Sequence, residues 1–221
     1  MLKHILFDND GTIVDSEMMA ARITLRHLAS HGLVLSEYAY NTRFPGLRTR
    51  DILLALEKEE GFVAPAGFLE AIHLDHRAAF DQSLEAIEGM PAIFTGLKIP
   101  KSMVSNGSVR HVRQCLQRVG LYDFFEGEIF SAEHVSQPKP SPELYRYALN
   151  KLQLSPEETL VVEDSTTGVL SAKGAGIQVI GFLGASHVYP EHAEALRAAG
   201  ADFIASNANE LSVLLKKNNA F

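Results

Sequence analysis

The sequence has a single cysteine, no excess of basic residues and no long apolar run. One cysteine, Cys115, excludes an intramolecular disulfide framework and is typical of a reducing compartment. A formal net charge of -7 provides no electrostatic footprint for nucleic acid or for an anionic membrane surface. No segment reaches the roughly 18 apolar residues that a transmembrane helix needs, and no signal region precedes the first predicted strand. We therefore expect a cytoplasmic protein that has neither nucleic acid nor a membrane as its partner.

Hydrophobic residues make up 46% of the 221 residues and charged residues 21%, which is typical of a globular chain. This length suits one large domain, or one domain that carries an insertion. Cys115 falls in a predicted helix, residues 108–119, with no convincing set of Cys or His ligands around it. We therefore predict that Cys115 is a small buried hydrophobe. The sequence leaves the oligomeric state open.

A short apolar strand near the N-terminus ends abruptly in two acids. Residues 4–7 are apolar and bounded by turn formers, which is typical of a buried strand, and Asp8 and Asp10 follow before the turn at Gly11. In open α/β sheets the functional site lies beyond such strand ends. Two carboxylates this close repel each other unless a cation or a shared proton neutralises them. An Mg²⁺ ion would do so and leave one carboxylate oxygen free to act as a nucleophile.

Two later segments could meet a phosphate group. Ser105-Asn106-Gly107 follows an apolar strand pattern and precedes a helix, so its N–H groups could bind an anion, although a plain strand-to-helix turn would use the same residues. Lys139 lies between Pro138 and Pro140, which restrict the backbone and would aim its side chain. The alternative is a solvated lysine on a rigid surface loop.

A second pair of acids, Glu163 and Asp164, ends another apolar strand pattern, residues 160–162. Two strand ends that carry four carboxylates can meet at one cation. Magnesium takes oxygen from a few protein groups and keeps some water or phosphate as further ligands. The sequence therefore predicts one metal site between the two acid pairs.

In this order, the four segments resemble the motifs of the haloacid dehalogenase (HAD) superfamily, and Asp8-Asn9-Asp10-Gly11-Thr12 resembles its D-x-D-G-[TV] signature. The resemblance implies phosphoryl transfer to Asp8, followed by hydrolysis of the aspartyl-phosphate, with Asp10 as general acid and base. It also implies that Ser105, Asn106 and Lys139 bind the phosphate. The implied Mg²⁺ ligands are Asp8, Asp10 through its backbone carbonyl, and Asp164, with Glu163 as a direct or indirect ligand.

Two regions of different pattern define the expected architecture. From residue 91 onward, strands alternate with helices, which predicts a parallel sheet with right-handed crossovers. Residues 15–90 show helical periodicity without any strand signal. Pattern and resemblance together predict an α/β fold with a Rossmann-like parallel core, residues 1–14 and 91–221, and an inserted all-helical cap, residues 15–90. The expected strands after the first are 102–104, 127–130, 159–162, 179–182 and 203–205.

The cap carries a basic loop on an acidic background. Residues 15–90 contain 12 acidic and 7 basic side chains, and three of the basic ones, Arg43, Arg48 and Arg50, fall within ten residues. Gly46, in the same loop, resembles a family glycine that reaches the substrate. We hypothesise that one or more of these arginines binds a second anionic group, such as a sugar-acid carboxylate. The alternative is three solvated arginines.

We therefore expect a Mg²⁺-dependent phosphatase of a small phosphorylated metabolite, a sugar or sugar-acid phosphate, in the subgroup that resembles 6-phosphogluconate phosphatase. Asp10 disfavours the dehalogenases and phosphonoacetaldehyde hydrolases of the superfamily, since their chemistry has no leaving alkoxide to protonate. A mutase of the β-phosphoglucomutase type remains an alternative, weakened by Ala20 where such mutases carry a histidine. A non-enzymatic ligand-binding protein is a third reading, disfavoured by the intact set of catalytic residue types.

Overall fold

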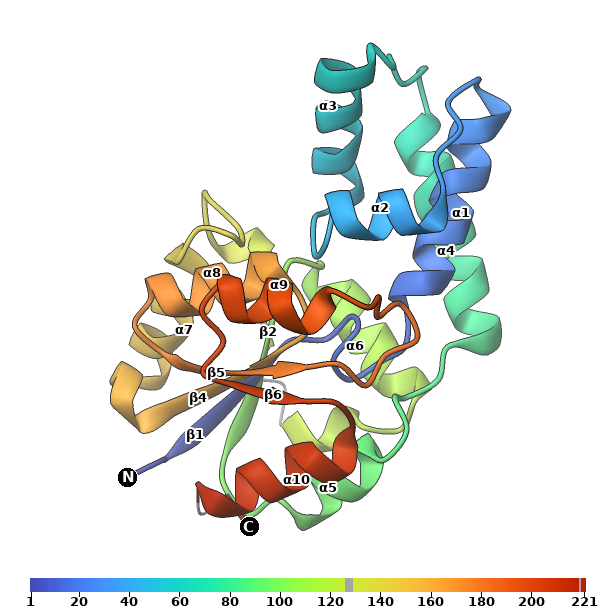
Figure 1. Ribbon diagram of the computed structural model, residues 1–221. Helices are drawn as coiled ribbons and strands as arrows, with labels where there is room; N and C mark the ends of the chain where they lie inside the picture. Colours follow the sequence, from blue (N-terminus) through green and yellow to red (C-terminus); the bar gives the residue numbers. More distant parts are fainter. Residues whose placement is uncertain (126–128, 219) are drawn as a thin grey trace.

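One parallel sheet forms the centre of the computed structural model, which describes residues 1–125, 129–218 and 220–221. The strand order is β3-β2-β1-β4-β5-β6 (Figure 1). The strand bounds are β1 His4–Phe7, β2 Lys101–Ser105, β3 Ile129–Ser131, β4 Thr159–Glu163, β5 Gln178–Phe182 and β6 Phe203–Ala205. The predicted parallel α/β sheet is confirmed, and the predicted start of β3 at residue 127 lies outside the described residues.

The helices fall into two groups. The first group precedes the second strand and comprises α1 Glu17–Ser30, α2 Glu37–Arg43, α3 Thr49–Glu60 and α4 Phe68–Ser83. The second group packs around the sheet and comprises α5 Met90–Gly96, α6 Val109–Arg118, α7 Glu143–Leu152, α8 Thr166–Gly174, α9 His192–Ala198 and α10 Ala208–Lys217. The helices α5, α9 and α10 were not predicted. α5 and α9 have seven residues each, too few to repeat an apolar stripe over several turns, whereas α10 has ten residues, as many as the predicted helix α6.

The central strand β1 is buried on both faces, and its side chains alternate between two apolar layers. Ile5 and Phe7 belong to one cluster, in which the ring of Phe7 meets the ring of Phe94 at 5.0 Å between centroids. Leu6 belongs to the opposite cluster, together with Tyr145. A strand covered on both faces reads as a continuous apolar run, which is why the sequence reveals β1 so clearly.

Helices α1 to α4 form a separate unit with its own core (Figure 1). Leu28, Leu56 and Ile72 are fully buried within this cluster. The chain enters and leaves the unit through two segments that pair with each other. The Asp15 N–H donates to the Glu85 carbonyl at 3.1 Å, and the Ile87 N–H donates to the Ile13 carbonyl at 2.9 Å. Both crossings therefore run side by side as one short antiparallel ribbon.

Among the described residues, no helix has the length and apolar character needed to cross a bilayer.

The stability of the sheet is expected to fall in mild acid because of His4. Its imidazole is buried, and Nε2 lies 2.9 Å from the Ser102 hydroxyl. Burial, assisted by the charge of Lys101, lowers the pKa of His4 to about 4. Folding therefore favours neutral His4, so its contribution is complete above about pH 6.5 and is lost as the pH falls toward 4.

Urea unfolding at pH 7 and pH 4.5 measures this effect. Glutamine does not titrate in this pH range. We therefore expect the unfolding free energy of His4→Gln to fall between pH 7 and pH 4.5 by about 1–2 kcal/mol less than that of wild type. An equal loss in wild type and variant would contradict the role of His4.

Candidate active site

Three neighbouring strands bring the predicted acids to one edge of the sheet. β1 pairs with β2 on one side and with β4 on the other, so their carboxyl ends lie together. Asp8 follows β1, Glu163 ends β4, and Asp164 comes next. All three carboxylates are buried, and each offers an oxygen within 4.8 Å of the others.

Lys139 lies at the centre of this acid group, although it comes from a loop after β3. Its Nζ donates to Asp8 Oδ1 at 2.7 Å, to Glu163 Oε1 at 2.6 Å and to the Val104 carbonyl at 2.6 Å. Only 4% of Lys139 is exposed. Burial opposes its charge, but the Asp8 and Glu163 carboxylates outweigh burial and hold the pKa of Lys139 well above its usual range. Lys139 is therefore a fixed cation facing Asp8.

The acid group has the chemistry of a divalent-cation site. Three carboxylates face one ammonium, and burial raises the pKa of Asp8 because the negative charge is not fully compensated. A Cβ on Gly11, which has φ +78°, would press on the Asp164 carboxylate, so only glycine allows this close approach. Oxygen donors of this kind fit Mg²⁺. Glu163 Oε2 already accepts from the Ser165 N–H and hydroxyl, so Glu163 holds its neighbours in place.

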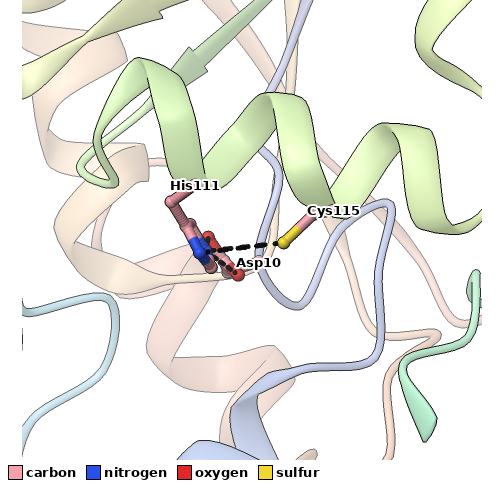
Figure 2. A group of neighbouring side chains, drawn as sticks. All are labelled: Asp10, His111 and Cys115. Carbon is pink, nitrogen blue, oxygen red and sulfur yellow. Dashed lines mark hydrogen bonds and ion pairs between the residues drawn. The ribbon is translucent and has the colours of Figure 1, made fainter. Parts of the chain in front are cut away.

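Asp10 is held by two side chains, one of which the sequence analysis overlooked. The Ser16 hydroxyl donates to Asp10 Oδ1 at 2.7 Å, and His111 Nε2 lies 3.0 and 3.2 Å from the two carboxylate oxygens (Figure 2). Although burial opposes ionisation, the charge of His111 keeps the pKa of Asp10 well below its usual range. The same contact raises the pKa of His111. Asp10 and His111 therefore share a strong charged pair.

Cys115 lies beside this pair on the same helix, α6. Its Sγ is 3.7 Å from His111 Nε2, and the residue is 2% exposed. The prediction of burial is confirmed, and His111, which the sequence did not single out, lies beside the thiol. His111 and Cys115 are four residues apart on α6, a spacing that the sequence already contained, whereas Asp10 is 101 residues away from His111.

Asn106 and Ser105 stand at the end of β2, close to Lys139. The Asn106 amide donates to the Lys139 carbonyl at 3.0 Å and accepts from the Lys139 N–H at 3.0 Å, so it fixes the lysine loop. It also donates to the Gly46 carbonyl at 3.2 Å, which ties the loop between α2 and α3 to the sheet. The Ser105 hydroxyl accepts from the Gly107 N–H at 2.9 Å. The structure thus brings the predicted phosphate-binding residues to the acid group.

A cavity of about 440 Å³ lies between the helical unit and this edge of the sheet. Its lining includes Asp8, Asp10, Ser105, Asn106, Lys139 and Asp164 from the sheet side, and Gly46, Arg48 and Arg50 from the helical unit. It also includes Glu17, Arg77, Arg110 and His187, which no motif in the sequence reveals. The cavity is therefore where a bound molecule would touch both units.

The three arginines that were predicted in one loop differ in their surroundings, and the structure places Arg43 at the end of α2 and Arg50 in the first turn of α3. Arg43 is not part of the cavity lining, and its guanidinium pairs with Glu59 and Glu60, each at 2.8 Å. Arg48 lines the cavity and binds Asp51 through two hydrogen bonds of 2.6 and 3.1 Å. Arg50 also lines the cavity and forms no ion pair with any described residue. Of these three arginines, Arg50 is therefore the one that is available to an anion.

Gly46 has φ +68° and approaches the sheet side closely. A Cβ at this position would lie 2.6 Å from the Ser165 hydroxyl oxygen, so a side chain cannot be accommodated without movement. The Thr167 hydroxyl donates to the neighbouring Pro45 carbonyl at 2.6 Å. These contacts hold the loop over the acid group.

Comparison with known proteins agrees with this geometry. The family model described as haloacid dehalogenase-like hydrolase matches residues 5–182. The 6-phosphogluconate phosphatase of Escherichia coli is 28% identical over 190 residues, which cover 86% of each chain.

Two solved structures match nearly the whole chain. A haloacid dehalogenase-like protein from Agrobacterium tumefaciens has a TM-score of 0.88 at 32% identity, covering 99% of this chain and 100% of its own. A HAD family hydrolase from Deinococcus radiodurans with bound phosphate and sodium has a TM-score of 0.79 at 31% identity, covering 98% and 96%. The predicted family and the predicted fold with its helical insertion are confirmed: the chain belongs to the haloacid dehalogenase-like hydrolases.

Proposed function

We propose that this protein is a Mg²⁺-dependent phosphatase that hydrolyses a small phosphorylated metabolite, a sugar or sugar-acid phosphate, through an aspartyl-phosphate on Asp8. The observation that carries the proposal is the buried group in which Lys139 contacts Asp8 and Glu163 beside Asp164. The group places a nucleophile, a fixed cation and a set of metal-type oxygen donors within reach of one phosphoryl group.

In the proposed reaction, a carboxylate oxygen of Asp8 attacks phosphorus while the bond to the leaving alcohol oxygen breaks. Asp10 passes a proton, drawn from the His111 imidazolium 3.0 Å away, to that oxygen. It then takes a proton from the water that attacks the aspartyl-phosphate, so inorganic phosphate leaves and Asp8 is regenerated. Lys139 and the Ser105 hydroxyl offset the charge on the phosphoryl oxygens. Mg²⁺, held by Asp8, Asp164 and the Asp10 carbonyl, would supply further charge compensation when bound.

We further propose that residues 15–90 are a cap and that residues 1–14 and 91–221 are the catalytic core. The cap would close over the cavity to exclude water and open to release product. The separate apolar core of α1 to α4 and the paired crossings at residues 13–15 and 85–87 support this division.

The proposed substrate class rests on the relatives and on the loop of the cap. The Escherichia coli relative is a 6-phosphogluconate phosphatase by name, and the Deinococcus structure holds phosphate. Arg50 adds an unpaired cation to the cavity, which would favour a substrate with a carboxylate besides its phosphate.

Phosphate release from a panel of sugar phosphates, sugar-acid phosphates and nucleotides, with Mg²⁺ and with EDTA, tests the proposal. We expect release to require Mg²⁺ and to be faster from 6-phosphogluconate than from glucose 6-phosphate. Turnover that needs a bisphosphate activator and releases no phosphate would favour a mutase instead. Tight binding of these compounds without any turnover would favour a ligand-binding protein.

The role of Arg50 has its own prediction. Arg50→Ala should raise KM for 6-phosphogluconate about tenfold, because a charged hydrogen bond to a carboxylate contributes roughly 1.5 kcal/mol, and should leave KM for glucose 6-phosphate nearly unchanged. Arg43→Ala is the matched control, since that guanidinium pairs with Glu59 and Glu60 outside the cavity. Equal effects of both variants, or equal effects on both substrates, would refute the assignment.

A further inference from the structure

Three side chains of different chemistry converge beside the cavity, apart from the group around Lys139: Asp10 and His111 line the cavity, and Cys115 is buried behind His111. Asp10, His111 and Cys115 each offer a ligand atom, and these atoms all lie within 4.8 Å of one another (Figure 2). His111 Nε2 is 3.0 Å from Asp10 Oδ1 and 3.7 Å from Cys115 Sγ. The imidazole thus stands between a carboxylate and a thiol.

These distances are close to those of a zinc centre. With Zn–N and Zn–O bonds of about 2.0 Å and a Zn–S bond of about 2.3 Å, tetrahedral geometry separates N from O by about 3.3 Å and N from S by about 3.6 Å. His111 and Cys115 lie on one face of α6 at a spacing of four residues, as pairs of zinc ligands on helices often do. The Asp10 oxygen and the Cys115 sulfur lie within 4.8 Å of each other, so these side chains would close on a bound ion.

An ion can reach this position from the cavity. Asp10 and His111 line the cavity, and their side chains are 20% and 28% exposed, whereas Cys115 is buried and is not part of the lining. An ion bound by all three would therefore have a fourth position directed toward solvent. Three protein ligands with one open position are a common arrangement for zinc.

Asn9 provides an independent observation at the same place. It is fully buried, and neither its Nδ2 nor its Oδ1 has a hydrogen-bond partner among the described residues. Its amide lies close to the Asp10 carboxylate and the Cys115 thiol, and burial raises the pKa of that thiol despite this neighbour. A buried amide without a partner is uncommon in folded proteins, and the lone pairs of Asn9 Oδ1 would meet a cation held beside it.

We propose that Asp10, His111 and Cys115 form a second metal site, selective for Zn²⁺ over Mg²⁺, through which Zn²⁺ inhibits the enzyme. A thiolate and an imidazole suit zinc, whereas Mg²⁺ prefers oxygen ligands alone. Zn²⁺ binds the Asp10 carboxylate, His111 Nε2 and Cys115 Sγ, and the imidazolium and thiol protons pass to solvent. The proposed inhibition rests on the proposed function, because Zn²⁺ occupies the carboxylate of the general acid Asp10. The proposed binding of Zn²⁺ does not depend on that function.

Cobalt substitution tests the binding without any substrate. Cys115 is the single cysteine of the chain, so a thiolate-to-Co²⁺ charge-transfer band can arise only from Cys115. We expect the full-length protein with excess Mg²⁺ to develop this band with one equivalent of Co²⁺, and one equivalent of Zn²⁺ to remove it. Absence of the band in folded wild-type protein would overturn the site.

Two variants and one control complete the test. Cys115→Ala and His111→Phe should each weaken Zn²⁺ binding, measured by competition with a chromogenic chelator, at least about tenfold, whereas His31→Ala on the surface of the helical unit should not. Equal Zn²⁺ affinity in wild type and both variants would overturn the site even if a variant were less stable.

Activity then separates the two proposals. Cys115→Ala should keep its Mg²⁺-dependent phosphate release within about twofold, and Zn²⁺ should inhibit it at least about tenfold less strongly than it inhibits wild type. Equal inhibition of both would place the inhibitory ion elsewhere and overturn the inference. If wild-type protein released no phosphate from any compound of the panel, the proposed function would be refuted, whereas the cobalt result would still stand.

Discussion

Asp8→Asn is expected to abolish Mg²⁺-dependent phosphate release, with a loss of at least about 10⁴-fold, because an amide cannot attack phosphorus to form the acyl phosphate. The fold should survive this change. The asparagine oxygen can still accept from Lys139 Nζ, and removal of one negative charge relieves repulsion with Glu163 and Asp164. We therefore expect an inactive protein with an unfolding temperature at or above that of wild type.

Single-turnover assays with wild type, Asp8→Asn and Asp81→Asn, combined with thermal unfolding, measure this result. Asp81 is exposed on α4, so its replacement makes the same chemical change away from the cavity and should leave the rate unchanged. Residual turnover above a few per cent in Asp8→Asn would show that another group attacks the phosphoryl centre.

Lys139→Met is expected to lower the unfolding free energy by about 3–5 kcal/mol and to remove activity as well. The substitution leaves the buried carboxylates of Asp8 and Glu163 without their cation, and an uncompensated buried charge is strongly destabilising. The thioether also leaves the Val104 carbonyl without its donor. Urea unfolding at pH 7 without metal isolates this effect.

Two further variants show whether the loss of stability in Lys139→Met comes from the buried charges. Lys173→Met removes a lysine that pairs with Asp202 where both side chains are about one-third exposed, so its cost should be about 0–1 kcal/mol. Adding Glu163→Gln to Lys139→Met should restore part of the lost stability, because one unpaired charge disappears. If the Lys139 and Lys173 variants were equally stable, the buried cluster would not have the electrostatic role assigned to it.

The sequence predicts the strands and the acids at the ends of two of them well, and the reason is physical. Strands buried on both faces are short continuous apolar runs, and here an acid follows β1 and another ends β4, which marks where each run stops. The short helices α5 and α9 have seven residues each, so no periodic stripe identifies them. Local pattern therefore suffices for the sheet but not for its shorter covering elements.

Side-chain partners are harder to predict, because they depend on residues that are distant in sequence. Arg43 and Arg50 look alike in the sequence, yet only Arg43 meets carboxylates, from Glu59 and Glu60 across a helix. The pair of Asp10 with His111 joins the segment after β1 to α6, and no motif connects the two. Such contacts become visible only when the elements are placed in space.

The paired crossings at residues 13–15 and 85–87 also constrain how the helical unit can move. Two connecting segments that enter a unit at separate points allow the unit to slide and tilt. Here, backbone hydrogen bonds from Asp15 to Glu85 and from Ile87 to Ile13 join the two segments into one flat strip. Such a strip bends easily about its width and resists shear in its plane. We therefore expect the helical unit to rotate as one rigid body about this strip. The amide protons of Asp15 and Ile87 should exchange slowly with solvent throughout the motion.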